Sequence, residues 1–121
     1  QLEETSGADL TDKGNAKEEY VRKALEYIRM NFSRKISVSE IAGNIGLDRS
    51  YLYSLFNEYL NTSPQEYLIG YRMEKARELM GSPSLTIGDV ARSVGYGDPL
   101  TFSKTFKKIY GKSPRNYRRT L

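Results

Sequence analysis

The side chains best suited to chemistry in this sequence are cations and hydroxyls, and they gather in two places. Residues 84–121 carry eight Lys and Arg against two Asp, a local charge of +6, whereas the whole chain carries +4. Residues 49–57 offer tyrosines and short polar side chains with little charge. Cations pair with anionic oxygens, and hydroxyl and amide groups donate and accept hydrogen bonds. This predicts binding of an anionic partner, although a solubilising surface is the alternative for a charge cluster of this size.

Most enzyme chemistry is excluded by composition. The 121 residues contain no histidine, cysteine or tryptophan. Disulfides, thiolate nucleophiles, imidazole bases and nearly every transition-metal site are thereby removed. Glu18 and Glu19 are explained by the acidic first turn of a helix. We expect no catalytic residue, no metal and no cofactor.

An internal repeat predicts the elements that position the polar groups. ISVSEIAGNIGL (residues 36–47) and LTIGDVARSVGY (residues 85–96) match in character at an offset of 49. The match resumes at an offset of 50, where Phe56 and Phe106 are identical, as are the Ser-Pro pairs that begin at Ser63 and Ser113. One structural unit therefore occurs twice.

Each repeat predicts a short helix, a sharp turn and a second helix. Ser37 and Thr86 suit the N-cap of the first helix, because their hydroxyls accept hydrogen bonds from the first turn. Gly46 and Gly95 end that helix, since glycine adopts the left-handed conformation without steric cost. Asp48 and Asp98 cap the second helix, and alanines one turn before each glycine let the two helices cross closely: Ala42 and Ala91. The pattern is typical of a DNA-binding helix-turn-helix, with an ordinary helical hairpin as the alternative.

The second helix of each repeat has one apolar and one polar face when its residues are placed at about 100° intervals. The inward faces are predicted to be Leu52, Leu55, Phe56 and Tyr59, and Phe102, Thr105, Phe106 and Ile109. The opposite faces carry Ser50, Tyr53, Ser54 and Asn57, and Leu100, Ser103, Lys104 and Lys107. A helix in the major groove contacts base edges with the outward residues of its N-terminal half.

The remaining segments connect the repeats. Val21, Ala24, Leu25, Ile28 and Phe32 recur at helical spacing and predict a first helix over residues 17–31. Residues 63–80 predict a linking helix of about 25 Å, which with the widths of the two units approaches the ~34 Å of one DNA turn. A short helix follows the second Ser-Pro pair and ends at Arg118 and Arg119. The domain organisation expected is a flexible linker over residues 1–16 and a tandem helix-turn-helix domain over residues 17–121, with unit one at 17–62, the linking helix at 63–80 and unit two at 85–121.

At this point the sequence resembles the DNA-binding domain of the AraC/XylS family of bacterial transcription regulators. The resemblance covers residues 17–121 and rests on ISVSEIAGNIGLDRSYLYSLF, on YLIGYRMEKARELM and on IGDVARSVGYGDPLTFSKTFKKIYGKSPRNYR. It implies an all-α fold of seven helices, with two helix-turn-helix units joined by a long linker helix and both recognition helices in successive major-groove segments. The first unit and the linker look most like members that regulate sugar utilisation.

The resemblance also implies roles for individual residues. The base contacts expected are Ser50, Tyr53, Ser54, Leu100, Thr101, Ser103 and Lys104. The charge and the helix faces, rather than the resemblance, predict the phosphate contacts: Arg49, Asn57, Lys107, Lys108, Lys112 and Arg115. Many members carry a basic or amide residue where Ser54 stands and lysines where Asn57 and Glu58 stand, so unit one is expected to bind more weakly here. For Tyr53, a ring lying in solvent is the alternative.

The expected partner is double-stranded DNA, with the transcription machinery as a further partner. No apolar run approaches the roughly 18 residues of a membrane span, so we expect a cytoplasmic protein without a membrane partner. Because the chain starts at Gln1, we expect a monomeric fragment of a regulator that dimerises through an upstream domain. A helical protein-interaction module with a basic docking surface is the competing hypothesis, and it predicts no preference among duplex sequences.

Overall fold

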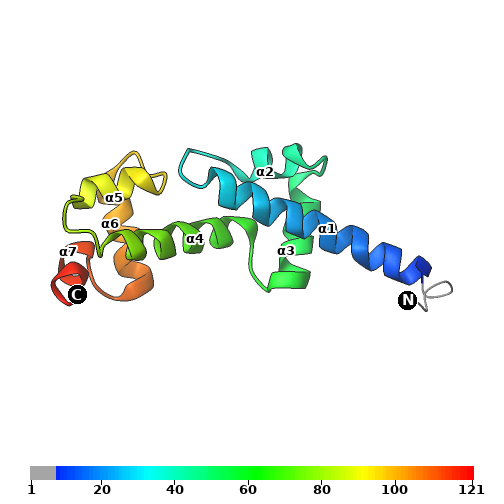
Figure 1. The fold of residues 1–121 in the computed structure, drawn as a ribbon. Coiled ribbons are helices and arrows are strands. Elements are labelled where there is room, and N and C mark those ends of the chain that lie inside the picture. Colours follow the sequence, from blue (N-terminus) through cyan, green and yellow to red (C-terminus); the bar gives the residue numbers. More distant parts are fainter. Residues whose placement is uncertain (1–7) are drawn as a thin grey trace. The chain divides into compact units, whose positions relative to one another are not determined.

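Seven α-helices make up residues 8–121, the part of the chain that the computed structural model describes, with side chains described from residue 16 onward. These residues contain no strand, so the prediction of an all-α fold is confirmed. The helices are labelled in Figure 1: α1 (Ala8–Asn31), α2 (Val38–Asn44), α3 (Arg49–Leu60), α4 (Pro64–Leu79), α5 (Ile87–Ser93), α6 (Pro99–Tyr110) and α7 (Pro114–Arg119).

The chain forms two compact units. The first contains α1 as far as Arg29 together with Ser37–Gln65, and the second contains Met30–Ile36 together with Glu66–Leu121. Within the first unit α2 packs on α3, and within the second α5 packs on α6 and α6 on α7. Each unit therefore holds one of the two predicted helix-turn-helix pairs.

Helix α1 begins earlier than the sequence pattern indicated. We expected a helix from about residue 17 and a linker over residues 1–16, but the helix starts at Ala8. Residues 8–16 contain no proline, and their single glycine costs a helix only about 1 kcal/mol. The first helix therefore extends through residues 8–16 of the predicted linker, and residues 1–7 of that linker lie outside the described residues.

The predicted caps and turns of both repeats are present. The hydroxyls of Ser37 and Thr86 accept hydrogen bonds from the backbone N–H groups three residues later, at 3.0 and 2.9 Å. Gly46 and Gly95 have φ of 79° and 97°, the left-handed values that the turn requires. In each unit, the segment between the paired helices therefore contains a left-handed glycine after the first helix and an N-capping aspartate before the second.

Gly95 has a second reason to be glycine. A Cβ at this position would lie 2.6 Å from the carbonyl oxygen of Phe32 and 3.0 Å from Nε of Arg72. The same arginine donates from Nε to the Phe32 oxygen at 3.0 Å and from Nη2 to the Arg34 oxygen at 2.8 Å. Its guanidinium also lies 5.7 Å from the ring centre of Tyr96. The segment after α1 is therefore tied to α4 and to the second turn within one unit.

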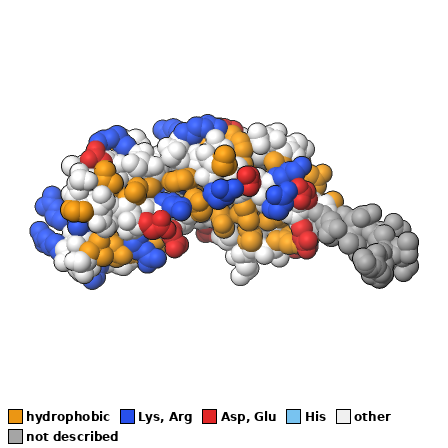
Figure 2. All heavy atoms as spheres, viewed as in Figure 1, with side chains coloured by type: hydrophobic (Ala, Val, Ile, Leu, Met, Phe, Trp, Pro, Cys, Tyr) orange, Lys and Arg blue, Asp and Glu red, His pale blue; other side chains and the backbone are white. Residues whose placement is uncertain are grey.

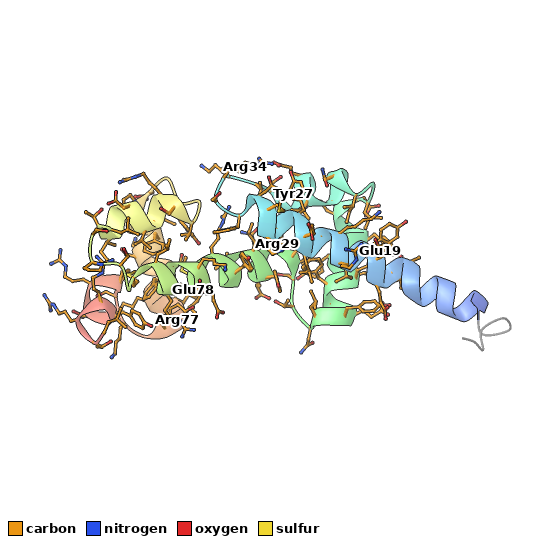
Figure 3. All side chains as sticks on the ribbon, viewed as in Figure 1. Glu19, Tyr27, Arg29, Arg34, Arg77 and Glu78 are labelled. Atoms are coloured by element: carbon orange, nitrogen blue, oxygen red, sulfur yellow. The ribbon has the colours of Figure 1, made fainter. Side chains whose placement is uncertain are left out.

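The first unit buries apolar side chains from three helices. Tyr27 of α1, labelled in Figure 3, donates a hydrogen bond to Glu40 of α2 at 2.5 Å. Tyr20 packs edge-to-face on Tyr51 of α3. Tyr59 was predicted to be inward and is only half-buried. The buried set is Val21, Ala24, Ile28, Ile41, Ala42, Leu52, Leu55 and Phe56.

The second unit has a continuous apolar core of Met73, Ala76, Met80, Val90, Ala91, Val94, Phe102 and Phe106. Ile109 was predicted to point inward but is 45% exposed. Tyr110 takes that place, because it packs on Phe106 at 4.8 Å between ring centres and lies one full turn further along the helix. Tyr117 of α7 completes this aromatic group at 5.5 Å from Phe106.

The two turn glycines provide a matched pair for a stability test. Both need a left-handed backbone, which costs a substituted residue about 1–2 kcal/mol, but a Cβ at Gly46 meets no atom within 4 Å. We expect Gly46→Ala to lower the free energy of unfolding by that amount, and Gly95→Ala by about 1–3 kcal/mol more, because its methyl overlaps a backbone carbonyl. Chemical denaturation of the two variants measures the difference. Equal losses would show that the close approach at Gly95 does not matter.

Candidate nucleic-acid interface

Helix α3 presents a polar face opposite its buried one. Asp48 caps the helix, and its Oδ1 accepts the Tyr51 N–H at 2.8 Å. Leu52, Leu55 and Phe56 are at most 1% exposed, which fixes the rotation of the helix about its axis. The predicted contact residues of this helix all lie on its exposed side: Arg49, Ser50, Tyr53, Ser54 and Asn57. Tyr53 is 57% exposed, so its ring is free of the core.

Helix α6, like α3, has one buried and one exposed face, but its exposed face carries different side chains. Phe102 and Phe106 are fully buried, and Leu100 on the other side is 62% exposed. Thr101 and Lys104 are also exposed, as predicted. Ser103 was also predicted to be outward but is half-buried, so its side chain is less accessible to a partner than those of Thr101 and Lys104.

An open hollow of about 490 Å³ lies beside the start of α3 in the first unit. Its lining joins the first residues of α2 and α4 to the exposed face of α3: Val38, Arg49, Ser50, Tyr53, Pro64 and Gln65. Three of these residues are predicted contact residues. The hollow therefore places part of the predicted α3 surface next to Gln65, which the sequence reasoning missed.

A repeat comparison would have found Gln65. It stands one residue after the first Ser-Pro pair, where Arg115 stands after the second, and Arg115 was predicted as a phosphate contact. Both side chains are exposed in the first turn of a helix that begins with proline. The same comparison pairs Asn61 with Gly111, which have φ of 55° and 80° and end α3 and α6.

The cations of α6 and of the turn after it are exposed and available. Figure 2 shows Lys and Arg side chains on the surface of the second unit, over α5, α6 and α7. Within residues 16–121, no ion pair engages the lysines predicted to contact DNA: Lys104, Lys107, Lys108 and Lys112. Arg115 is exposed as well. In the first unit, by contrast, Lys17 pairs with Glu58 of α3 at 3.5 Å.

Two arginines of residues 84–121 have structural partners instead. Arg92 donates to Oδ1 of Asp89 at 2.7 Å. Arg118 donates to the backbone oxygens of Leu85 at 2.6 Å, Met80 at 3.3 Å and Ser82 at 3.5 Å. A guanidinium satisfies several carbonyls at once because its N–H groups form a planar fork. The local charge of +6 therefore overstates the cationic surface available to an anion.

The carboxylates beside this surface are held in the ionised form. The pKa of Asp98 is lowered, first by the Thr101 hydroxyl and then by the Leu100 N–H, both of which donate to it. The pKa of Asp89 is lowered mainly by the backbone N–H and hydroxyl of Thr86. Hydrogen bonds to the charged form favour that form. Both groups are thus acceptors at neutral pH.

A repeated helix-turn-helix whose second helix exposes a polar face is the architecture of a DNA-binding protein. The family model of a helix-turn-helix domain matches residues 41–120. The chain therefore belongs to this helix-turn-helix family, the DNA-binding domain of AraC/XylS-type transcription regulators. This class of domain is not enzymatic, and the interaction-module alternative is not favoured.

Known proteins similar to this chain include transcription regulators and the C-terminal domain of a response regulator. The Msm operon regulatory protein of Streptococcus mutans is 34% identical over 99% of this chain and 43% of its own length. The lactose operon transcription activator of Staphylococcus xylosus is 41% identical over 83% of this chain and 36% of its own length. The C-terminal domain of AraT, a response regulator from Geobacillus stearothermophilus, is 38% identical with a TM-score of 0.81, covering 84% of this chain and 85% of that one. The chain spans about two fifths of the length of these curated relatives.

Two further observations concern the described residues. None of their helices is long and apolar enough to cross a membrane. No cluster of three or more acidic residues among them is arranged to hold a metal ion.

The structural role of Arg118 can be separated from its charge. We expect Arg118→Met to lower the free energy of unfolding by about 1–3 kcal/mol, because it leaves half-buried carbonyls without their donor. Arg119→Met is the matched control, since it removes the same charge one residue later, where the side chain is exposed and bonds only Asn116 at 3.3 Å. That variant should stay within about 0.5 kcal/mol of the parent in the same denaturation experiment. Equal destabilisation of both variants would contradict this assignment.

Proposed function

We propose that the chain binds duplex DNA sequence-specifically by inserting α3 and α6 into successive segments of the major groove. The observation that carries the proposal is the fixed rotation of both helices. Each buries apolar side chains almost completely on one face, namely Leu52, Leu55 and Phe56 on α3 and Phe102 and Phe106 on α6, and exposes the predicted contact residues on the other. A major groove about 12 Å wide accepts one α-helix, whose outward residues then meet base edges. Helix α4, with 16 residues, covers about 24 Å of the chain between the two repeats.

The two helices divide the work between them. On α3, bases are contacted by the hydroxyls of Ser50 and Ser54 and by the ring of Tyr53. On α6, bases are contacted by Leu100, Thr101 and Lys104. The half-buried Ser103 contributes less to base contact. Phosphate contacts come from exposed side chains around these faces: Arg49, Gln65, Asn57, Lys107, Lys108, Lys112 and Arg115. Most of the cations are in the second unit, so this unit provides most of the salt-dependent affinity.

The whole protein is proposed to be a cytoplasmic regulator of a carbohydrate operon. The names of its relatives support this, since they include regulators of the lactose and raffinose operons. Because the chain covers only about two fifths of such relatives, sugar sensing, dimerisation and contacts with the transcription machinery belong to the proposal for the full-length regulator. The chain itself supplies its contact with DNA.

The division of work predicts different salt dependences. Replacing Lys107 and Lys112 with alanine should flatten the slope of log K against log salt concentration by up to ~1.8, because each lost phosphate contact removes about 0.9. Replacing Ser50 with alanine and Tyr53 with phenylalanine should weaken binding to the preferred duplex while leaving the slope nearly unchanged. Fluorescence anisotropy over a salt series measures both. Equal changes in slope for the two double variants would refute the division.

DNA affinity should also be nearly independent of pH around neutrality. The sequence has no histidine, and the lowered pKa values of Asp89 and Asp98 keep both carboxylates ionised well below that range. At constant ionic strength, we therefore expect less than a twofold change in Kd between about pH 6 and 8. A steep loss across this interval, measured by the same anisotropy assay, would reveal a titrating contact that the interface described above lacks.

A further inference from the structure

The carboxylate of Asp98 holds two donors at the start of α6. Its Oδ1 accepts the Leu100 N–H at 3.0 Å, which caps the helix. Its Oδ2 accepts the hydroxyl of Thr101 at 2.8 Å. Thr101 is exposed and lies on the part of α6 proposed to meet base edges. One carboxylate therefore joins the helix cap to a proposed base contact.

This bond decides which way the Thr101 hydroxyl is polarised. An ionised carboxylate only accepts, so the single hydroxyl proton must lie between Thr101 and Asp98. The lowered pKa of Asp98 agrees with this direction, since the Thr101 hydroxyl is its largest cause. The oxygen of Thr101 then offers only lone pairs to any other partner. A free threonine hydroxyl, in contrast, donates or accepts and pairs with any base.

We propose that Asp98 is a positioning residue that fixes Thr101 as a hydrogen-bond acceptor toward DNA. Thr101 then selects a base with an amino group in the major groove, which means N6 of adenine or N4 of cytosine. It disfavours O4 of thymine and O6 of guanine, because two acceptors would face each other without a proton. The proposal rests on the proposed function of α6 as a recognition helix.

Binding should strengthen the arrangement. When α6 enters the groove, water leaves the surroundings of Asp98 and hydrogen bonds to its charge gain strength in the lower dielectric. Without the bond to Thr101, the Asp98 carboxylate would face the phosphates with the Leu100 N–H but without its second donor. Lys104, one turn further along the same helix, adds an attractive charge. The Thr101 hydroxyl is therefore expected to keep donating its hydrogen bond to the ionised Asp98 in the complex.

The first unit provides the matched comparison. Asp48 occupies the equivalent cap and accepts the Tyr51 N–H at 2.8 Å. Where Thr101 stands in the second unit, the first has Tyr51, whose ring packs edge-to-face on Tyr20 with centres 6.3 Å apart. Asp48 therefore caps its helix without orienting a short hydroxyl. Replacing either aspartate removes a capping carboxylate, but only Asp98 orients a proposed base contact.

The experiment is selection of bound sequences from a randomised duplex pool, followed by affinity measurements on single-position variants of the selected site. The proteins are the parent chain, Thr101→Val, Asp98→Ser and Asp48→Ser. Serine keeps an N-capping oxygen but lacks the second acceptor that holds the Thr101 proton. The position contacted by Thr101 is the one whose base preference disappears in Thr101→Val.

At that position the parent should prefer adenine or cytosine over thymine or guanine by about tenfold. Asp98→Ser should reduce this ratio to within about threefold, because the released hydroxyl can also donate. Asp48→Ser should leave the ratio unchanged, even if overall affinity falls. Loss of the helix cap would weaken binding to all duplexes alike. A change in the ratio of affinities for different bases at one position therefore reports the orientation of the Thr101 hydroxyl instead.

Modified bases in the DNA test the same contact with the parent protein alone, so the result does not depend on whether a protein variant folds. Substituting purine for a selected adenine, or 2-pyrimidinone for a selected cytosine, removes only the amino group and should cost the parent a similar factor. A parent preference for thymine or guanine, an unchanged ratio in Asp98→Ser, or no position affected by Thr101→Val would overturn the inference while leaving DNA binding intact. A pool that yields no enriched sequence would contradict the proposed function itself.

Discussion

The close crossing of two short helices is the constraint on which the rest of this structure depends. In each repeat a small buried alanine, Ala42 or Ala91, lets the helices approach, and a left-handed glycine turns the chain between them. With the crossing set, burial of two apolar positions of the second helix determines its rotation. The other face of α3 or α6 then points outward, because these buried side chains are packed on the opposite side. Two exposed faces of quite different charge are thus carried on one scaffold.

Two arginines support this scaffold through backbone carbonyls. Arg72 binds the segment after α1, and Arg118 binds the segment after α4. Each segment follows a helix end, where carbonyl groups lack intrahelical partners. A long side chain with a forked donor group satisfies several of them from a distance. The positive charge of such residues serves the fold, so net charge is a poor measure of how much cationic surface an anion can reach.

The features that the sequence predicted well are local or repeated. Helix caps and turns depend on residue type and short spacing. Each was predicted twice, because the repeat pairs Ser37 with Thr86 and Gly46 with Gly95. Arg118 escaped prediction because its acceptors lie more than thirty residues away, where no periodic pattern reports contact. Ile109 was misplaced because Tyr110, four residues after Phe106, packs on the Phe106 ring with centres 4.8 Å apart, which leaves Ile109 exposed. The start of α1 was missed because polar residues without an apolar stripe still form a helix.

The central claim is that both α3 and α6 contact bases in the major groove. Dimethyl sulfate interference on a selected duplex tests it most directly, because methylation of guanine N7 modifies the major groove and methylation of adenine N3 the minor groove. The account predicts that N7 methylation blocks binding in two separate segments about one helical turn apart, while N3 methylation has little effect. Interference confined to a single segment, or found mainly at adenine N3, would contradict it.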